Sequence, residues 1–183
     1  MSESQQNLKS NEKAYIDLIE KKVSALRLFL NSHTLNKDFS VDDKFHYLTK
    51  LKEIIGNFHN DISFLSTLMA KRFLEQKYGP LDFDAGEKPQ GAPGPDIALT
   101  LSDGRSIHCE IKTTKPYQPG FGAQQKTAIK KDLTKLTNSP VDLKFMMVTD
   151  QSAFETLCGS SYASHARGIV IVNLLSGKTF IHS

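Results

Sequence analysis

Two carboxylates and a lysine lie in a stretch that otherwise has the pattern of a β-hairpin, GPDIALTLSDGRSIHCEIKTT at residues 94–114. They are Asp96, Glu110 and Lys112. A hard divalent cation such as Mg²⁺ is bound in proteins by one or two carboxylates and keeps several waters. A neighbouring ammonium could hold a phosphate oxygen or an attacking water beside that cation. The stretch therefore has the residue types for metal-assisted hydrolysis, provided that the fold brings them together.

The register of the hairpin decides whether these side chains meet. Alternation gives each strand one apolar face, formed by Ile97, Leu99 and Leu101 in the first strand and by Ile107, Cys109 and Ile111 in the second. The two apolar faces coincide if Ser102-Asp103-Gly104 forms a three-residue loop with Gly104 in the left-handed conformation. A two-residue Asp-Gly loop would instead place Ile97 opposite Glu110. The three-residue loop is predicted, and it places Asp96 across from Glu110, with Lys112 and His108 on the same face.

Pro95-Asp96, thirteen further residues and then Glu110-Ile111-Lys112 resemble the core motif of the PD-(D/E)XK nuclease superfamily. The order of helix, hairpin, helix and strand around the motif is also similar to that superfamily's α-β-β-β-α-β core, over roughly residues 60–175. The resemblance implies a restriction endonuclease-like fold and phosphodiester hydrolysis that depends on Mg²⁺, with Mn²⁺ as a substitute. It implies that Asp96, Glu110 and the Ile111 carbonyl bind the metal and that Lys112 positions or activates the nucleophilic water.

The superfamily often adds an acid from the helix that precedes the hairpin. Glu75 is the only acid in LSTLMAKRFLEQKYG and is therefore the candidate for this role. The alternative is an ordinary solvent-exposed helix residue. Asp82 and Asp84, on the way into the hairpin, are more distant candidates.

The helix predicted from about Ala123 to Leu136 would follow the motif strand and border the same face. Its apolar side is expected to consist of Ala128, Ile129, Leu133 and Leu136. In related nucleases a Gln or Lys on this helix touches the phosphate, which makes Gln125 and Lys126 additional candidates. The candidates for binding DNA are Lys115, Tyr117, Lys130 and Lys131. The alternative is a solvated amphipathic helix preceded by a plain connecting loop.

The elements around the motif predict an α/β (α+β) fold with a mixed sheet flanked by helices. Helical periodicity recurs over residues 15–30, 40–55 and 62–73, with a capping box at Ser40. Strand patterns occur at 143–150, 168–175 and 178–183, with a helix at 151–164 between the first two. We expect a flexible tail at residues 1–9, an N-terminal helical region at 10–58 and the catalytic core at 59–183.

Charge and composition are consistent with a polyanionic partner. The segment from Arg105 to Lys144 has eight Lys or Arg residues against three acids, which suits DNA, although a solvated basic face is the alternative. No apolar run is long enough for a membrane span and no signal peptide is evident, so a cytoplasmic protein with reduced Cys109 and Cys158 is expected. The chain has no phosphate-binding loop, so no nucleotide cofactor is expected.

The function expected from the sequence is that of a Mg²⁺-dependent endodeoxyribonuclease, most simply a type II restriction enzyme. Cleavage of both DNA strands requires two active sites, so a homodimer assembled through the helical region is expected. The alternatives are a structure-specific or DNA-repair nuclease and a DNA-binding protein of the same fold that does not cleave. A helical interaction protein with an incidental acidic hairpin is a third alternative, but it leaves the basic segment unexplained.

Overall fold

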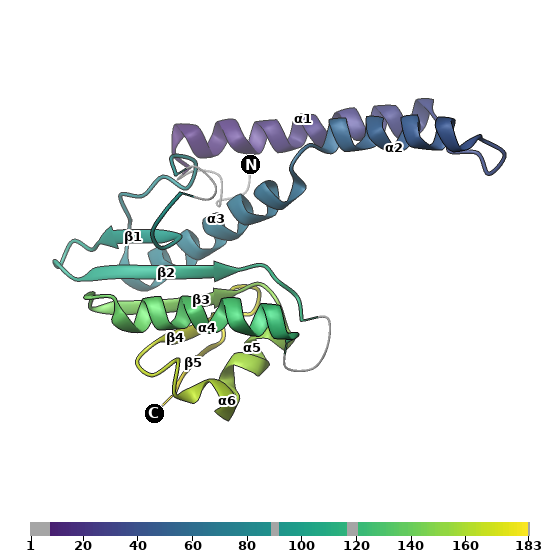
Figure 1. Cartoon of the computed structure of the whole chain (residues 1–183). Coiled ribbons are helices and arrows are strands. Elements are labelled where there is room, and N and C mark those ends of the chain that lie inside the picture. The colour runs from purple at the N-terminus through teal and green to yellow at the C-terminus, as the bar shows by residue number, and fades with distance from the viewer. Residues whose placement is uncertain (1–7, 89–91, 117–120, 183) are drawn as a thin grey trace. The chain divides into compact units, whose positions relative to one another are not determined.

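The computed structural model describes residues 8–88, 92–116 and 121–182, which form six helices and five strands (Figure 1). The chain divides into two compact units. The first comprises Met1–Asp61 and Asp84–Pro89, and the second comprises Ile62–Phe83 and Gln90–Ser183.

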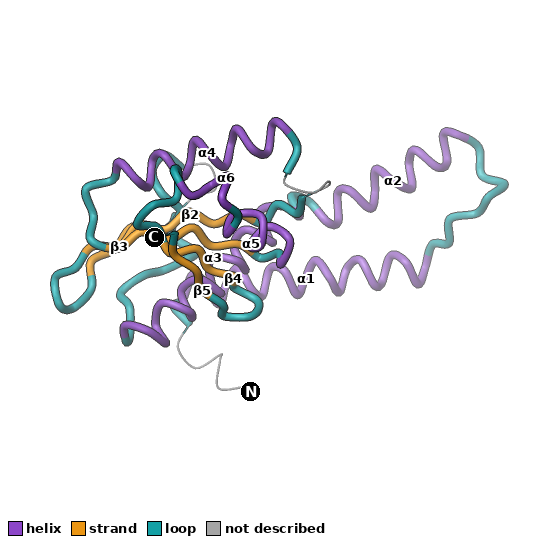
Figure 2. The backbone as a smooth tube through the Cα atoms, turned by 90° about the horizontal axis from the view of Figure 1, so that it is seen from below, coloured by secondary structure: helices purple, strands orange, loops and turns teal. Residues whose placement is uncertain are grey.

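In the first unit, α1 (Ser10–Ser32) and α2 (Val41–Ile55) lie side by side as a helical hairpin (Figure 2). The capping box predicted at the start of α2 is confirmed: the Asp43 amide donates to Ser40 Oγ, and the Ser40 amide donates to the Asp43 carboxylate. Capping fixes where this helix begins, but no residue of α2 is fully buried within the described chain.

Two buried carboxylates join the helices of this unit to other segments. Glu12 accepts hydrogen bonds from the backbone amides of Lys9 (2.8 Å) and Ala85 (2.9 Å). Asp61, in the first turn of α3 (Phe58–Tyr78), accepts two hydrogen bonds of 2.9 Å from the Lys22 ammonium. Burial is tolerated because each carboxylate is paired with donors.

The second unit contains a five-stranded mixed sheet in the order β1-β2-β3-β4-β5. The strands are β1 (Ile97–Thr100), β2 (Ser106–Lys112), β3 (Leu143–Val148), β4 (Val170–Asn173) and β5 (Thr179–Ile181). The pairs β1–β2 and β4–β5 are antiparallel, whereas β2–β3 and β3–β4 are parallel. The parallel pairs need crossover connections, which are supplied by α4 (Ala123–Asn138) and by α5 (Gln151–Cys158) with α6 (Ser160–Ala163). The predicted mixed sheet with flanking helices is confirmed.

Each face of the sheet packs against different helices, because alternate side chains of a strand point to opposite faces. The face covered by α3 forms a core with Leu74, Ile97, Cys109, Phe145 and Met147 among its members. The face covered by α4 and α5 forms a second core with Ile129, Leu133, Met146, Val148 and Leu157 among its members. Ala128 was expected in this core but is exposed, because the buried side of α4 is a narrower stripe centred on Ile129, Leu133 and Leu136.

The predicted register of the β1–β2 hairpin is confirmed. Ile97 pairs with Cys109, and the Leu101 amide donates to the Arg105 carbonyl across the three-residue loop. Gly104 has φ +88°, a left-handed conformation that a side chain would strain. The apolar side of the hairpin therefore packs toward α3, and its polar side lies on the face that α4 covers.

No helix in the described ranges combines the length and the hydrophobicity that a membrane span requires.

Candidate active site

Asp96 directly precedes β1 and is fixed by the neighbouring strand. Its Oδ2 accepts a hydrogen bond of 2.6 Å from the Ile111 amide. If β1 began earlier in the chain, this amide would pair with a backbone carbonyl of β1; because the strand begins only at Ile97, the Asp96 carboxylate takes that place. Asp96 Oδ1 accepts no hydrogen bond from the described residues. The bonded oxygen therefore fixes the orientation of the carboxylate.

The Ile111 carbonyl points to the same side of β2 as its amide. The neighbouring Lys112 carbonyl accepts from the Thr149 amide on the β3 side, and successive residues of a strand alternate in the direction of their backbone groups. Ile111 therefore turns its amide and its carbonyl toward β1, where the amide meets Asp96. The carbonyl oxygen and Asp96 thus lie at the same edge, beyond the start of β1.

Glu110 is a buried carboxylate that accepts no hydrogen bond from the described residues. Its closest cation is Lys112, with the ammonium nitrogen 3.7 Å from Oε2. Burial and the negative charge of Asp96 raise the pKa of Glu110 above its ordinary value, and the Lys112 charge only partly offsets them. A buried acid opposite a second acid is a position at which a cation would relieve both desolvation and repulsion.

Lys112 is anchored from across the site by a residue of α4. Its ammonium lies 2.8 Å from Asp132 Oδ2, and Lys135 binds the other oxygen, Oδ1, at 3.1 Å. Burial disfavours the charge on Lys112, but the hydrogen bond and attraction of Asp132, together with Glu110, outweigh it and raise the pKa of the ammonium. Lys112 is therefore a cation held at the polar side of the hairpin.

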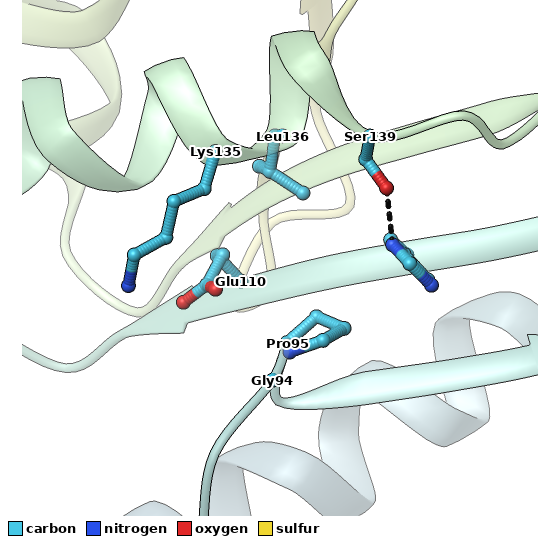
Figure 3. Close-up of a pocket in the computed structure, with 7 residues that line it drawn as sticks. Gly94, Pro95, Glu110, Lys135, Leu136 and Ser139 are labelled. Carbon is cyan, nitrogen blue, oxygen red and sulfur yellow. Dashed lines mark hydrogen bonds between the residues drawn. The ribbon is translucent and has the colours of Figure 1, made fainter.

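A cavity of about 240 Å³ opens beside Glu110, between the hairpin and α4. Figure 3 shows Glu110 and Lys135 at one end of this cavity, Pro95 and Leu136 across its middle, and Ser139 at the other end. The Ser139 hydroxyl forms a hydrogen bond of 2.5 Å with His108 Nδ1, so this imidazole closes the far end. His108 thus lines the cavity without contacting Glu110.

Gln125, an additional candidate on α4, contacts the segment that follows β2. Its amide nitrogen donates 3.1 Å to the Lys115 carbonyl, and its oxygen accepts from the Gly122 amide. These two bonds tie the start of the helix to the chain that leaves β2. Gln125 therefore shapes the edge of the site through the backbone.

The remaining candidates are distributed over the second unit and its connections. Lys115, Lys126 and Lys131 are exposed and Lys130 is partly buried, whereas Tyr117 lies outside the described residues. Glu75 is partly buried on α3, the helix that covers the opposite face of the sheet. Asp82 is exposed, and Asp84 accepts from Asn11 within the first unit. The structure brings together Asp96, Glu110, Ile111 and Lys112.

Asp132 was missed as a site residue by the sequence analysis. It is one of three acids in a basic segment, and it follows Ile129 by three residues and precedes Leu136 by four, so it lies on the buried side of α4. An acid on the apolar stripe of the helix after the motif is the signal that could have identified it. Its partner could not be read from the sequence, because the pair joins α4 to β2.

Within the described ranges, no group of three or more His, Cys, Asp or Glu side chains is arranged to hold a metal ion. A metal at this site would therefore depend on two carboxylates, the Ile111 carbonyl and water. No family model matches the chain, and neither the curated proteins nor the solved structures give a significant match.

In the metal-free protein, Glu110→Gln is expected to increase the free energy of unfolding at about pH 7 but to have little effect at about pH 4. The raised pKa means that the folded state binds the Glu110 proton more tightly than the unfolded state. The wild type therefore loses stability as the pH rises from the ordinary pKa of 4.5 through the raised value, and the neutral Gln does not.

Denaturant unfolding in EDTA at the two pH values measures this difference. Glu155→Gln, at an exposed position on α5, is the matched control. An effect of Glu110→Gln that is the same at both pH values would contradict the raised pKa.

Proposed function

We propose that the chain is a Mg²⁺-dependent endodeoxyribonuclease of the PD-(D/E)XK superfamily. The observation that carries the proposal is that Asp96, held by the Ile111 amide just before β1, acts with its charge on the buried Glu110 carboxylate, while the Lys112 ammonium lies 3.7 Å from Glu110. These three side chains stand at the positions of the sequence motif. Mn²⁺ is expected to substitute for Mg²⁺.

The donor set suits a hard divalent cation. Asp96 offers one oxygen, Glu110 offers a carboxylate that accepts no hydrogen bond within the described chain, and the Ile111 carbonyl points to the same edge. When bound, Mg²⁺ would neutralise charge on the phosphate and lower the pKa of water. All-oxygen ligation with several waters is the arrangement that Mg²⁺ prefers.

The protein's own groups have separate tasks in this mechanism. Asp96 and Glu110 bring negative charge to one edge of the sheet, and the Ile111 amide keeps the Asp96 carboxylate in place. Lys112 remains protonated, and its ammonium lies on the same face of β2 as Glu110. There it can stabilise the charge that develops on the scissile phosphate. The cavity that Glu110 and Lys135 line leaves space for part of the substrate next to Glu110.

The basic segment supports DNA as the substrate. The exposed ammonium groups of Lys115, Lys126 and Lys131 are on the chain that leaves the motif strand and on α4. Contacts of this kind bind the phosphate backbone without reading sequence, and their binding weakens as salt rises. We propose that these side chains position the duplex, with Tyr117, which lies outside the described residues, as a further candidate.

Type II restriction cleavage is the form of the activity that we favour, because the motif strand reads EIKTT and the chain is small. A structure-specific or repair nuclease is the alternative. Between α3 and α4 the described residues form two strands, where the superfamily's core has three. The proposal therefore rests on the hairpin, α4 and β3 rather than on the complete core.

The wild-type protein is expected to cut plasmid and phage DNA in Mg²⁺ and to leave it intact in EDTA. Lys112→Ala should reduce the rate by about 100-fold or more, because a charge-stabilising group is lost from the transition state. Gel electrophoresis of a mixed DNA panel measures both effects, with Lys178→Ala, an exposed lysine before β5, as the matched control.

The products distinguish the remaining alternatives. Discrete fragments support restriction-type cleavage, whereas nicks or smears support a repair-type nuclease. Salt-sensitive binding without cleavage under any of these conditions would overturn the proposed nuclease in favour of a DNA-binding protein.

We further propose that the enzyme acts as a homodimer through the α1–α2 hairpin. Val41, Phe45 and Leu48 are 81%, 66% and 56% exposed, and their four- and three-residue spacing places them on one side of α2. Val23 and Leu30, two turns apart on α1, are also about half exposed. A second copy of the chain would bury these apolar stripes and supply the second active site.

Phe45→Glu is expected to convert the dimer into a monomer, because a charge would replace the most exposed aromatic side chain of the stripe. Analytical ultracentrifugation should give twice the 20.4 kDa chain mass for the wild type and the single mass for the variant. Lys50→Gln, which makes the same change of charge at an exposed position on the side of α2 away from the stripe, is the control that should remain dimeric. A wild-type protein that is monomeric at micromolar concentration would refute the dimer.

A further inference from the structure

The ion pairs around Lys112 are unequal, and the shorter one does not involve the proposed metal site. The ammonium lies 2.8 Å from Asp132 Oδ2 but 3.7 Å from Glu110 Oε2. The side chains of Lys112 and Asp132 are 24% and 13% exposed. This pair is therefore shielded from water to a degree that surface ion pairs are not.

Asp132 is held in a fixed position by the packing of α4. Its neighbours on the same side of the helix, Ile129, Leu133 and Leu136, are buried in the core against the sheet. Its second oxygen is occupied by Lys135, at 3.1 Å. Because α4 is fixed by this packing, the Asp132 carboxylate cannot move with the flexible Lys112 side chain. The carboxylate therefore determines where the Lys112 ammonium lies.

Removal of Asp132 would leave Glu110 as the nearest anion to Lys112. A lysine side chain has enough rotatable bonds to close the gap from 3.7 Å to hydrogen-bond distance. Glu110 accepts no hydrogen bond from the described residues, so the lysine would not have to displace a donor among them. The collapsed pair would occupy and neutralise a carboxylate that the cation needs.

We propose that Asp132 is a positioning residue that holds the Lys112 ammonium beside Glu110 but not on it, so that Glu110 stays open to a divalent cation. The inference rests on the proposed function only in taking Glu110 as a metal-binding carboxylate. Lys135, which Figure 3 shows extending from α4 toward the side of Glu110, balances the second charge of Asp132.

The first experiment is a double-mutant cycle on Mg²⁺ affinity, measured by titration calorimetry without DNA. Asp132→Asn should weaken Mg²⁺ binding about tenfold. Losses of this size are typical when a residue that supports the metal ligands, without binding the metal itself, is removed. In a Lys112→Met background that also carries Lys135→Met, the same Asp132→Asn change should have little effect, because neither lysine that binds Asp132 is left to move onto Glu110. Asp132→Glu should restore most of the affinity.

An equal loss of affinity with and without Lys112 would overturn the proposal, because it would mean that Asp132 acts only through its charge. No loss in either background would overturn it as well. Thermal unfolding of each variant establishes that the comparison is made between folded proteins.

The second experiment observes the lysine itself and needs neither metal nor cleavage. In ¹⁵N-lysine-labelled protein, the hydrogen-bonded Lys112 ammonium should give a slowly exchanging ¹H–¹⁵N signal, assigned by its loss in Lys112→Met. Asp132→Asn should shift or broaden this signal, and adding Glu110→Gln should alter it again because the ammonium has moved onto Glu110. A signal that Asp132→Asn leaves unchanged would overturn the proposal.

The two readouts separate this inference from the proposed activity. Wild-type protein that binds no Mg²⁺ would refute the metal site, whereas the ammonium signal would still decide what Asp132 does. Mg²⁺ binding with the expected cycle but no DNA cleavage would refute the nuclease and support the role of Asp132.

Discussion

The candidate site depends on the register of a single β-hairpin. A slip of one residue would move every polar side chain of the hairpin to the opposite face, and the left-handed Gly104 in a three-residue loop prevents that slip. The same register puts the Asp96 carboxylate within reach of the Ile111 amide, where β1 has not yet begun. The Asp96 carboxylate thus takes the place of a backbone carbonyl in the hydrogen-bond ladder between β1 and β2, and it is held at the edge of the sheet.

The cost of this arrangement is concentrated at Glu110. A buried carboxylate beside another acid is unfavourable, and the raised pKa of Glu110 expresses that. Lys112, with its ammonium 3.7 Å from Glu110, offsets this charge only in part, because it is bound more closely to Asp132 on α4. The packing of α4 against the sheet therefore keeps Lys112 from closing on Glu110, and the Glu110 carboxylate stays only partly neutralised. Such a carboxylate can bind a cation.

Local patterns in the sequence were sufficient to predict the hairpin, its register and the face that Glu110 and Lys112 share. Apolar alternation and one glycine determine all of these. Asp132 could not be paired with Lys112 in this way, because their contact depends on how α4 crosses β2. Ala128 was placed in the core incorrectly, since periodicity gives the direction of an apolar stripe more reliably than its width. That DNA is the partner, and where it would bind, remain predictions, because they depend on contacts with a second molecule.

The central claim is that Asp96, Glu110 and the Ile111 carbonyl share one divalent cation. The most direct test is the anomalous diffraction signal of Mn²⁺ in crystals of the wild-type protein. The account predicts a peak at the edge of the sheet that is bounded by Asp96 and Glu110, with Lys112 still bound to Asp132. A well-ordered site without a peak at saturating Mn²⁺, or with Lys112 hydrogen-bonded to Glu110 instead, would contradict it.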